Sequence, residues 1–339
     1  MKVLLYEQFA KAQKTSGIGR ALRHQKKALE DNGIEVTFDK NDTYDLVHIN
    51  SSFIYTYFFL KKILKKNIPV VVHGHSTYED FRYSFRCWRL LGFIYFNRNL
   101  SRLYRHAPLI ITPTEYSKHL IENYKVTKCP VIAISNGIML EEYEYSEEKV
   151  AKFKEFFKIK DNEKVVVGVG LYFQRKGILD FIEIAKKMPE IKFIWFGYLK
   201  KYMAQDKINW AIRHAPKNCL FPGYIDGDII KGALSSANVV FFPSYEETEG
   251  IVALEALASK TPLLIRDIPV YQDWLEDGVN CYKGKNNEEF IEKINYICSN
   301  DNSKIVENGY EVAKERSIEK VGKKLIEAYS QAIEISKKK

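Results

Sequence analysis

Short apolar runs that alternate with helical patterns from end to end are the feature that most constrains how this chain can fold. They occupy residues 3–6, 34–38, 45–49, 70–73, 109–112 and 131–134 in the first half, and residues 165–169, 192–196, 219–221, 239–242, 263–265 and 279–282 in the second. Several are apolar throughout, as expected for parallel strands whose sheet is covered by helices on both faces. The alternation therefore predicts an α/β fold with two doubly wound domains.

The boundary between the domains is expected after Ser135-Asn136-Gly137, because a polar and acidic segment follows at residues 141–148. This gives a first domain over residues 1–137 and a second over residues 138–317, each large enough for its own core. A final amphipathic helix is predicted over residues 318–335, and we expect the segment of residues 318–339 to pack back on the first domain.

Positive charge is concentrated in the first half of the chain. Residues 1–137 contain 21 Lys and Arg against 11 Asp and Glu, whereas residues 138–339 contain 31 against 32. The excess indicates an anionic partner for the first half alone, and a membrane surface and a nucleic acid both qualify.

The cysteines and the apolar runs indicate a cytoplasmic protein. The five cysteines are widely spaced and form no C-x-x-C pair, which favours reduced thiols over a disulfide frame or a zinc site. The apolar start at residues 1–6 is too short for a signal peptide. The longest apolar run, residues 53–60, is far below the roughly 20 residues of a membrane-spanning helix. We therefore expect a chain that is soluble or peripheral to a membrane.

The densest cluster of polar residues lies between an apolar run at residues 237–241 and a helical pattern at residues 251–258. A Pro-Ser turn, three carboxylates and a glycine separate the two, and a further carboxylate lies in the helix: Glu246, Glu247, Glu249, Gly250 and Glu255. A strand, a polar turn and a helix N-terminus form the usual ligand crevice of an open α/β sheet. Carboxylates beside such a helix start repel phosphate and suit neutral hydroxyls, which suggests a sugar.

A glycine-containing loop, Thr-Ser-Gly-Ile-Gly-Arg, precedes a helix predicted at residues 21–29. Gly17 and Gly19 would let the backbone approach a phosphate at the helix start. A tight loop without function is equally consistent with these residues.

A second loop, residues 168–177, follows the strand that opens the second half. It places Arg175 and Lys176 at the carboxyl end of that strand, where a diphosphate would lie. The alternative is an exposed basic turn.

Two histidines, His73 and His75, flank a glycine just past a predicted strand. The acidic residues that follow nearby favour an active-site role over structural hydrogen bonding. Other histidines lack such a setting, and we interpret them as structural: His24, His48 and His106.

Residues 81–106 interleave arginines with large apolar side chains. Helical spacing places three arginines on one face and three on another: Arg82, Arg86 and Arg89, and Arg98, Arg102 and Arg105. Together with Trp88, these faces suit insertion at an anionic lipid interface. A core-facing helix with a solvated polar side is the alternative, and the positive first half favours the membrane. A break near Gly92 predicts two helices.

Together these motifs resemble glycosyltransferase family 4. Seven residues separate Glu247 from Glu255, and Pro243-Ser244 precedes them, which resembles the E-x7-E signature of the family. The resemblance extends over essentially the whole chain. It implies the GT-B fold, in which two Rossmann-like domains face a central cleft, and a retaining, metal-independent enzyme that uses a nucleotide-sugar donor.

The resemblance also implies roles for single residues. Glu247 would grip a hydroxyl of the donor sugar, Glu255 would hold the ribose hydroxyls, and Lys176 would bind phosphate. The implied donor-binding set is Gly17, Gly19, Arg175, Lys176, Tyr224, Ile225, Glu247, Thr248, Glu249, Gly250, Ile251 and Glu255. The implied catalytic set is His75, Arg175, Lys176 and Glu247.

Three positions depart from the family pattern. The family usually has Gly-Phe-Gly after the first glutamate, where this chain has Thr248-Glu249-Gly250. Leu171 replaces an arginine before the lysine, and we hypothesise that Arg175 compensates. Met139 replaces an acid in the crossover between the domains.

Asp226-Gly227-Asp228 resembles the D-x-D metal clamp of other sugar-transfer enzymes, but its place after a predicted strand favours a turn. We predict no metal and no cofactor.

Within the family, residues 75–81 resemble a stretch of the bacterial diacylglycerol glucosyltransferases, which favours His75 over His73 as the active-site histidine. The glycine loop and the His-Gly-His-Ser run are most similar to those of enzymes that add the second sugar. The resemblance implies transfer of glucose or galactose from a UDP-sugar to a glycolipid, with monoglucosyl-diacylglycerol as the expected acceptor, at the inner face of the membrane. The alternatives are a transferase of capsule or teichoic-acid synthesis and a non-catalytic GT-B subunit. Nucleic-acid binding is the other interpretation of the basic first half, but we predict no nucleic-acid partner.

Overall fold

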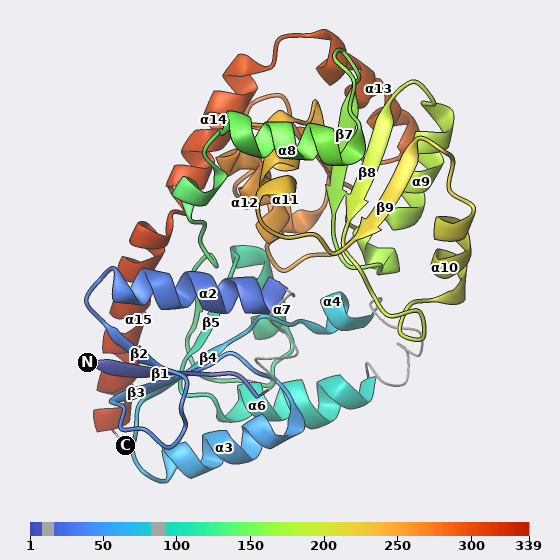
Figure 1. The fold of residues 1–339 in the computed structure, drawn as a ribbon. Coiled ribbons are helices and arrows are strands. Elements are labelled where there is room, and N and C mark those ends of the chain that lie inside the picture. Colours follow the sequence, from blue (N-terminus) through green and yellow to red (C-terminus); the bar gives the residue numbers. More distant parts are fainter. Residues whose placement is uncertain (9–16, 83–92, 339) are drawn as a thin grey trace. The chain divides into compact units, whose positions relative to one another are not determined.

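A computed structural model describes residues 1–8, 17–82 and 93–338 of the chain (Figure 1). The described residues divide into two units, one of residues 1–137 with residues 316–338, the other of residues 138–315. Each unit is built on one parallel six-stranded sheet. The predicted α/β fold with two doubly wound sheets is therefore confirmed.

The first unit contains β1 (Lys2–Tyr6), α2 (Gly17–Glu30), β2 (Glu35–Thr37), β3 (Leu46–Ile49), α3 (Ile54–Leu64), β4 (Val70–His73), α4 (Tyr78–Arg82), a π-helical turn (Phe96–Leu100), α6 (Ser101–His106), β5 (Ile110–Thr112), α7 (Glu115–Asn123), β6 (Val131–Ala133) and α15 (Ile318–Lys337). Its strand order is β2-β1-β3-β4-β5-β6. The chain winds in opposite directions from the point between β1 and β3. In open α/β sheets, ligands bind at such a switch point, beyond the carboxyl ends of the strands.

Helices cover both faces of this sheet. Successive residues of a strand point to opposite faces, so each strand contributes side chains to two cores. Val3 and Leu5 of β1 lie in a core with α2 and α15, whereas Leu4 lies in a core with α3, α6 and α7 (Figure 1). The backbones of α15 and α2 approach closely at Gly322, where a Cβ atom would lie 2.3 Å from the carbonyl oxygen of Ala28. The C-terminal helix is thus an integral layer of the first unit.

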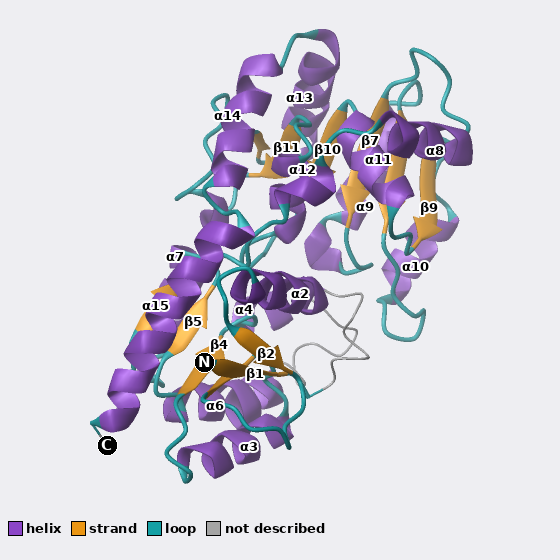
Figure 2. Ribbon diagram, turned by 60° about the vertical axis from the view of Figure 1, so that its left-hand side comes forward, coloured by secondary structure: helices purple, strands orange, loops and turns teal. Residues whose placement is uncertain are grey.

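The second unit contains a 3-10 turn (Leu140–Tyr143), α8 (Glu147–Phe157), β7 (Val165–Val169), a 3-10 turn (Gln174–Lys176), α9 (Ile178–Lys187), β8 (Lys192–Phe196), α10 (Asp206–Arg213), β9 (Cys219–Gly223), α11 (Asp228–Ser236), β10 (Val239–Phe242), α12 (Ile251–Ala258), β11 (Leu263–Arg266), a 3-10 turn (Pro269–Tyr271), β12 (Tyr282–Gly284), α13 (Asn287–Ser299) and α14 (Ser303–Lys314) (Figure 2). The strand order β12-β11-β10-β7-β8-β9 puts the switch point between β7 and β10.

All twelve predicted strands are present, and ten of them begin and end within one residue of the predicted bounds. The other two, β9 and β12, differ by more. β12 begins three residues later than predicted, because Gly278 adopts a φ of 73° and donates a backbone hydrogen bond to Cys281 that closes a turn. β9 continues through Pro222, which an edge strand tolerates because its outer N–H positions need no partner.

Candidate active site

In the second unit, the loops that follow β7 and β10 meet at the switch point. The ammonium group of Lys176 pairs with the Glu247 carboxylate, and Nη1 of Arg175 lies 3.7 Å from the same carboxylate oxygen. Arg175 also binds the loop that follows β10 through its backbone oxygen, which accepts a 2.7 Å hydrogen bond from the amide of Tyr245. The structure thus brings together three of the four predicted catalytic residues, although Glu247 lies 72 and 71 positions after Arg175 and Lys176 in the sequence.

The Glu247 carboxylate is charged although it is buried, with an exposed fraction of 6%. Burial by itself raises the pKa of Glu247, but the charges of Lys176 and Arg175 outweigh burial and hold the pKa below its ordinary value. The three side chains carry two positive charges and one negative charge. Their excess of positive charge suits an anionic ligand group.

Gly177 makes the close approach of the two loops possible. It adopts a left-handed φ of 76°, and a Cβ atom there would lie 2.4 Å from the carbonyl oxygen of Pro243. Any other residue would push the loops apart and strain the turn that precedes α9.

The residues after Glu247 lead into the N-terminus of α12, which has no side-chain cap. Gly250 turns the chain there with a φ of 86°, and a Cβ atom on it would lie 2.6 Å from the Tyr271 hydroxyl. Thr248 is half-buried, while Glu249 and Glu255 are only 1% and 2% exposed. The departure from the family pattern at Glu249 therefore places a buried carboxylate beside the predicted donor site.

Arg266, at the end of β11, orders this loop and was missed in the sequence. Its guanidinium group lies 3.9 Å from the centre of the Tyr245 ring, and its Nε donates to the carbonyl oxygen of Pro243 at 3.1 Å. Asp180 lies 3.5 Å from the same guanidinium and accepts a 3.0 Å hydrogen bond from the Tyr245 hydroxyl. A charged residue that ends an otherwise apolar strand was the only signal available.

His75 lies in the first unit, just past β4. Its Nε2 is 2.7 Å from Oδ1 of Asn50, and its ring stacks on His73 with 3.8 Å between ring centres. His48 also joins this cluster, with Nε2 3.1 Å from Nδ1 of His73. The interpretation of His48 as a purely structural residue therefore overlooked its link, through His73, to His75.

Gly17 and Gly19 do not form the predicted loop. The structure places both in the first turn of α2, which begins four residues earlier than predicted, and neither has a positive φ. The conformational freedom of glycine is therefore not used here, and a helix start remains the feature that could face a phosphate.

Residues 83–92 of the predicted membrane stretch, among them Arg86, Trp88 and Arg89, lie outside the described residues, as does the side chain of Arg82. Arg98 and Arg102 are exposed on the π-helical turn and α6. No helix among the described residues is long and apolar enough to span a bilayer.

The Asp-Gly-Asp motif forms a turn, as predicted. Asp226 accepts a hydrogen bond from the amide of Gly227 at 2.8 Å, and Asp228 pairs with Lys152 at 2.6 Å where α11 begins. Tyr224, just before the turn, is 43% exposed, and Ile225 is half-buried. Within the described ranges, no three His, Cys, Asp or Glu side chains converge where they could hold a metal ion.

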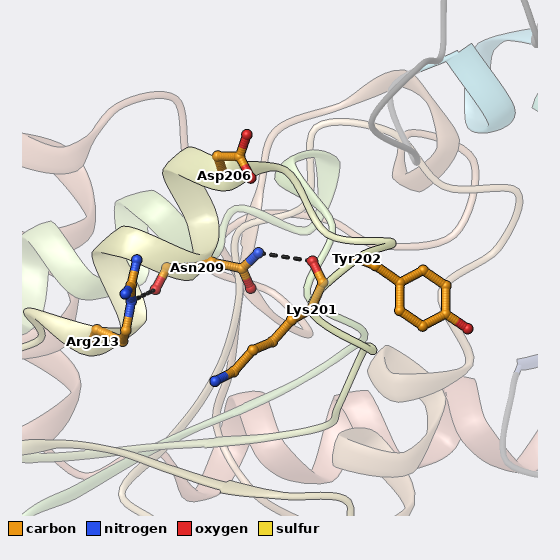
Figure 3. Close-up of a pocket in the computed structure, with 5 residues that line it drawn as sticks. All are labelled: Lys201, Tyr202, Asp206, Asn209 and Arg213. Carbon is orange, nitrogen blue, oxygen red and sulfur yellow. Dashed lines mark hydrogen bonds between the residues drawn. The ribbon is translucent and has the colours of Figure 1, made fainter.

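A pocket of about 440 Å³ lies beside α10. Figure 3 shows Asn209 between Tyr202 and Arg213, with its side-chain amide donating a hydrogen bond to the Lys201 carbonyl oxygen. None of the predicted site residues lines this pocket.

Comparison with known proteins identifies the family. The model described as Glycosyltransferase Family 4 matches residues 38–142, and the one described as Glycosyl transferases group 1 matches residues 149–315. The chain is 54% identical over 337 residues to the processive diacylglycerol alpha-glucosyltransferase of Acholeplasma laidlawii, covering 99% of this chain and 100% of the relative. It is 26% identical over 276 residues to the alpha-monoglucosyldiacylglycerol synthase of the same organism, covering 76% and 67%.

The solved structure of Anabaena HepE in complex with UDP-glucose shares the fold, with a TM-score of 0.75 at 18% identity, covering 98% of this chain and 100% of that one. Sucrose-phosphate synthase from Thermosynechococcus elongatus superposes with a TM-score of 0.76 at 16% identity, covering 98% of both chains. The full-length identity to the Acholeplasma enzyme confirms the resemblance carried by the motifs: this chain belongs to glycosyltransferase family 4 and is a glycosyltransferase with the GT-B fold.

Proposed function

We propose that this chain transfers glucose or galactose from a UDP-sugar to monoglucosyl-diacylglycerol, with retention of configuration and without a metal ion. The single observation that carries the proposal is the 54% identity, over the whole chain, to a processive diacylglycerol alpha-glucosyltransferase. UDP-glucose carries an α-linked sugar, so formation of an α-linked product corresponds to retention.

The charged side chains of Arg175, Lys176 and Glu247, at the switch point of the second sheet, are suited to this reaction. As the bond between sugar and phosphate breaks, negative charge gathers on the diphosphate leaving group. Lys176 and Arg175 would stabilise that charge, in the role that a metal ion has in other transferases. Glu247, held as a carboxylate, would accept a hydrogen bond from a hydroxyl of the donor sugar.

We propose that the acceptor hydroxyl attacks from the face that the diphosphate leaves and gives its proton to a departing phosphate oxygen. His75 would position the sugar or the acceptor, and Glu255 would hold the ribose hydroxyls. Neither role needs a covalent intermediate on the protein.

The test incubates the enzyme with UDP-glucose or UDP-galactose and with vesicles that contain diacylglycerol or glucosyl-diacylglycerol. Thin-layer chromatography of the extracted lipids identifies the donor and acceptor that give product. Product with UDP-glucose or UDP-galactose and the monoglucosyl lipid supports the proposal. Transfer only to soluble sugars or to a polymer intermediate would instead identify a transferase of another cell-envelope glycan.

We propose further that the first unit binds the cytoplasmic surface of an anionic membrane. Helices α3 and α6 pack together, with 5.1 Å between the ring centres of Tyr57 and His106, and both views show them next to each other (Figure 2). Exposed basic and apolar side chains gather on these helices and on the residues that lead into α6: Tyr55, Phe58, Lys61, Lys62, Phe93, Ile94, Arg98 and Arg102. This combination suits an anionic lipid interface.

Sedimentation with vesicles tests the α3–α6 surface. Phe58→Ala with Lys62→Glu should weaken binding to vesicles rich in phosphatidylglycerol. The matched change Tyr296→Ala with Lys304→Glu, at two exposed positions of the second unit, should leave binding unchanged. Equal binding by both variants would refute this surface, and salt-sensitive binding to DNA in place of vesicles would favour a nucleic-acid partner.

A further inference from the structure

Asn50 occupies the switch point of the first sheet. It follows β3 directly, and its amide donates a 2.8 Å hydrogen bond to the carbonyl oxygen of Tyr6 at the end of β1. Its side chain is buried, with an exposed fraction of 2%, and its Oδ1 lies 2.7 Å from Nε2 of His75. The sequence gives no reason to connect Asn50 with His75, which follows a different strand.

The hydrogen-bond partners fix the proton on the His75 ring. An amide oxygen can only accept, so Nε2 of His75 must carry the hydrogen. The other end of the amide agrees, because Nδ2 of Asn50 faces the carbonyl oxygen of His48 at 3.5 Å and donates to it. If the amide were turned over, two oxygens would face each other there. In a neutral imidazole with hydrogen on Nε2, the Nδ1 atom has a free lone pair and accepts.

The plane of the His75 ring is fixed by a second contact. The ring of His73 stacks on it at 3.8 Å with an angle of 9° between the planes. His73 is itself held by Gln25, whose Nε2 lies 3.0 Å from its Nδ1, and by His48, which lies 2.7 Å from the Tyr329 hydroxyl of α15. The stack and the Asn50 bond together restrain both the tilt and the rotation of the ring.

The surroundings keep this ring neutral. Burial lowers the pKa of His75 to about 3, and the stacked His73 is kept neutral by burial as well. A neutral ring of such low basicity is a poor proton donor and a poor general base at neutral pH. The ring can instead act as an oriented hydrogen-bond acceptor through its Nδ1 atom.

We infer that Asn50 is a positioning residue that holds His75 as the neutral Nε2–H tautomer, so that Nδ1 of His75 accepts a hydrogen bond from a hydroxyl group of a substrate. The inference rests on the proposed function for the presence of a sugar or lipid hydroxyl. The recognised chemistry is an O–H donor, from either the transferred hexose or the acceptor. An ether or fluorine at that position would not satisfy Nδ1.

A double-mutant cycle tests whether Asn50 acts through His75. We expect Asn50→Ala to lower kcat/KM about tenfold, in the range of one lost hydrogen bond at a polar site. His75→Ala should lower it at least as much, and the double variant should be no worse than His75→Ala alone. Asn300→Ala, in the second unit, serves as the control that leaves activity unchanged. Independent, multiplying losses would show that Asn50 does not act through His75 and would overturn the inference.

Nitrogen-15 NMR of the labelled full chain reads the tautomer directly and needs no substrate. We expect Nε2 of His75 to be protonated in the wild type and in Asn50→Asp, which retains the acceptor oxygen. In Asn50→Ala, a mixture of tautomers is expected. A wild-type His75 with hydrogen on Nδ1 would refute the inference even if transfer to the glycolipid is observed. Conversely, the expected spectrum with no transfer would support the Asn50 assignment and count against the proposed function.

Hydrolysis of the donor without acceptor identifies the source of the hydroxyl. If Nδ1 binds the hexose, His75→Ala and Asn50→Ala should slow hydrolysis of the UDP-sugar by similar factors. If Nδ1 binds the acceptor, hydrolysis should stay at the wild-type rate while the KM for the glycolipid rises. If neither the rate of hydrolysis nor the KM for the glycolipid changes in these variants, no substrate hydroxyl reaches Nδ1.

Discussion

Replacing Lys176 by methionine removes one of the two positive charges beside Glu247 and keeps most of the side-chain volume. The side chains of Glu247 and Lys176 are only 7% and 14% exposed, so the pair is screened little by water. Removing one partner of a buried ion pair typically costs about 3–5 kcal/mol, because the other charge is left uncompensated. Here Arg175 remains 3.7 Å from Glu247, where two unit charges in an effective dielectric of about 20 interact by about 4.5 kcal/mol.

Because Arg175 still compensates Glu247, we expect Lys176→Met to destabilise the second unit by about 2 kcal/mol at pH 7, less than the full cost of an orphaned charge. For a unit of this size, that lowers Tm by about 4–8 °C in calorimetry. The surface change Lys187→Met is the control. Lys187 pairs at 3.6 and 3.8 Å with two glutamates, but all three side chains are about half exposed or more, so Tm should move by less than about 2 °C.

The pH dependence separates an ion-pair effect from a packing effect. The pKa of Glu247 is lowered in the folded state, from an ordinary value of 4.5. Its pairing therefore stabilises the fold above that value and is lost as the pH falls through the folded pKa. The stability difference between Lys176→Met and the wild type should therefore shrink as the pH falls below 4.5. An equal difference at pH 7 and pH 3.5, or none at pH 7, would refute the electrostatic reasoning.

Three further predictions concern the donor site. Gly177→Ala should lower Tm in calorimetry by several degrees and abolish transfer, because a Cβ atom would lie 2.4 Å from the Pro243 carbonyl oxygen; wild-type Tm would show that the loops can separate. Arg266→Lys should raise the KM for the UDP-sugar about tenfold with little change in the KM for lipid, since lysine cannot both stack on Tyr245 and bond Pro243; equal effects on both KM values would indicate general unfolding. Dialysis against EDTA should leave the transfer rate unchanged, and recovery of a lost rate on adding Mg²⁺ would disprove metal independence.

The sequence predicted the sheets well because apolar strands buried on both faces leave a strong local signal. Leu4 and Leu5 must both be apolar, since α3 covers one side of β1 and α15 the other. The predicted starts of β12 and α2 were wrong, because local backbone geometry determines where these two elements begin. The start of β12 depends on the left-handed Gly278, and the start of α2 depends on helix formation through two glycines, against their low helix propensity.

The pairing of Lys176 with Glu247 was foreseeable only through the resemblance to family 4, because the residues lie 71 positions apart and neither flanking pattern refers to the other. For Asn50 and Arg266, no resemblance to the family indicated which residues they contact. An asparagine after a strand is typical of a turn, and an arginine at the end of a strand is expected to be exposed to solvent. Their roles depend on which strands are neighbours, and strand order is not encoded in local periodicity.

Strand order also explains why the predicted residues gather where they do. Each sheet winds in opposite directions from one point, between β7 and β10 in the second unit and between β1 and β3 in the first. At such a point the two strand-end loops diverge to opposite faces of the sheet, which opens a crevice beyond their carboxyl ends. Lys176 and Glu247 follow β7 and β10, and Asn50 follows β3 with its amide bound to the last residue of β1. A polar residue in a strand-end loop is therefore a stronger candidate for substrate contact when its strand borders the switch point, and this criterion selects Asn50 over the many other asparagines of the chain.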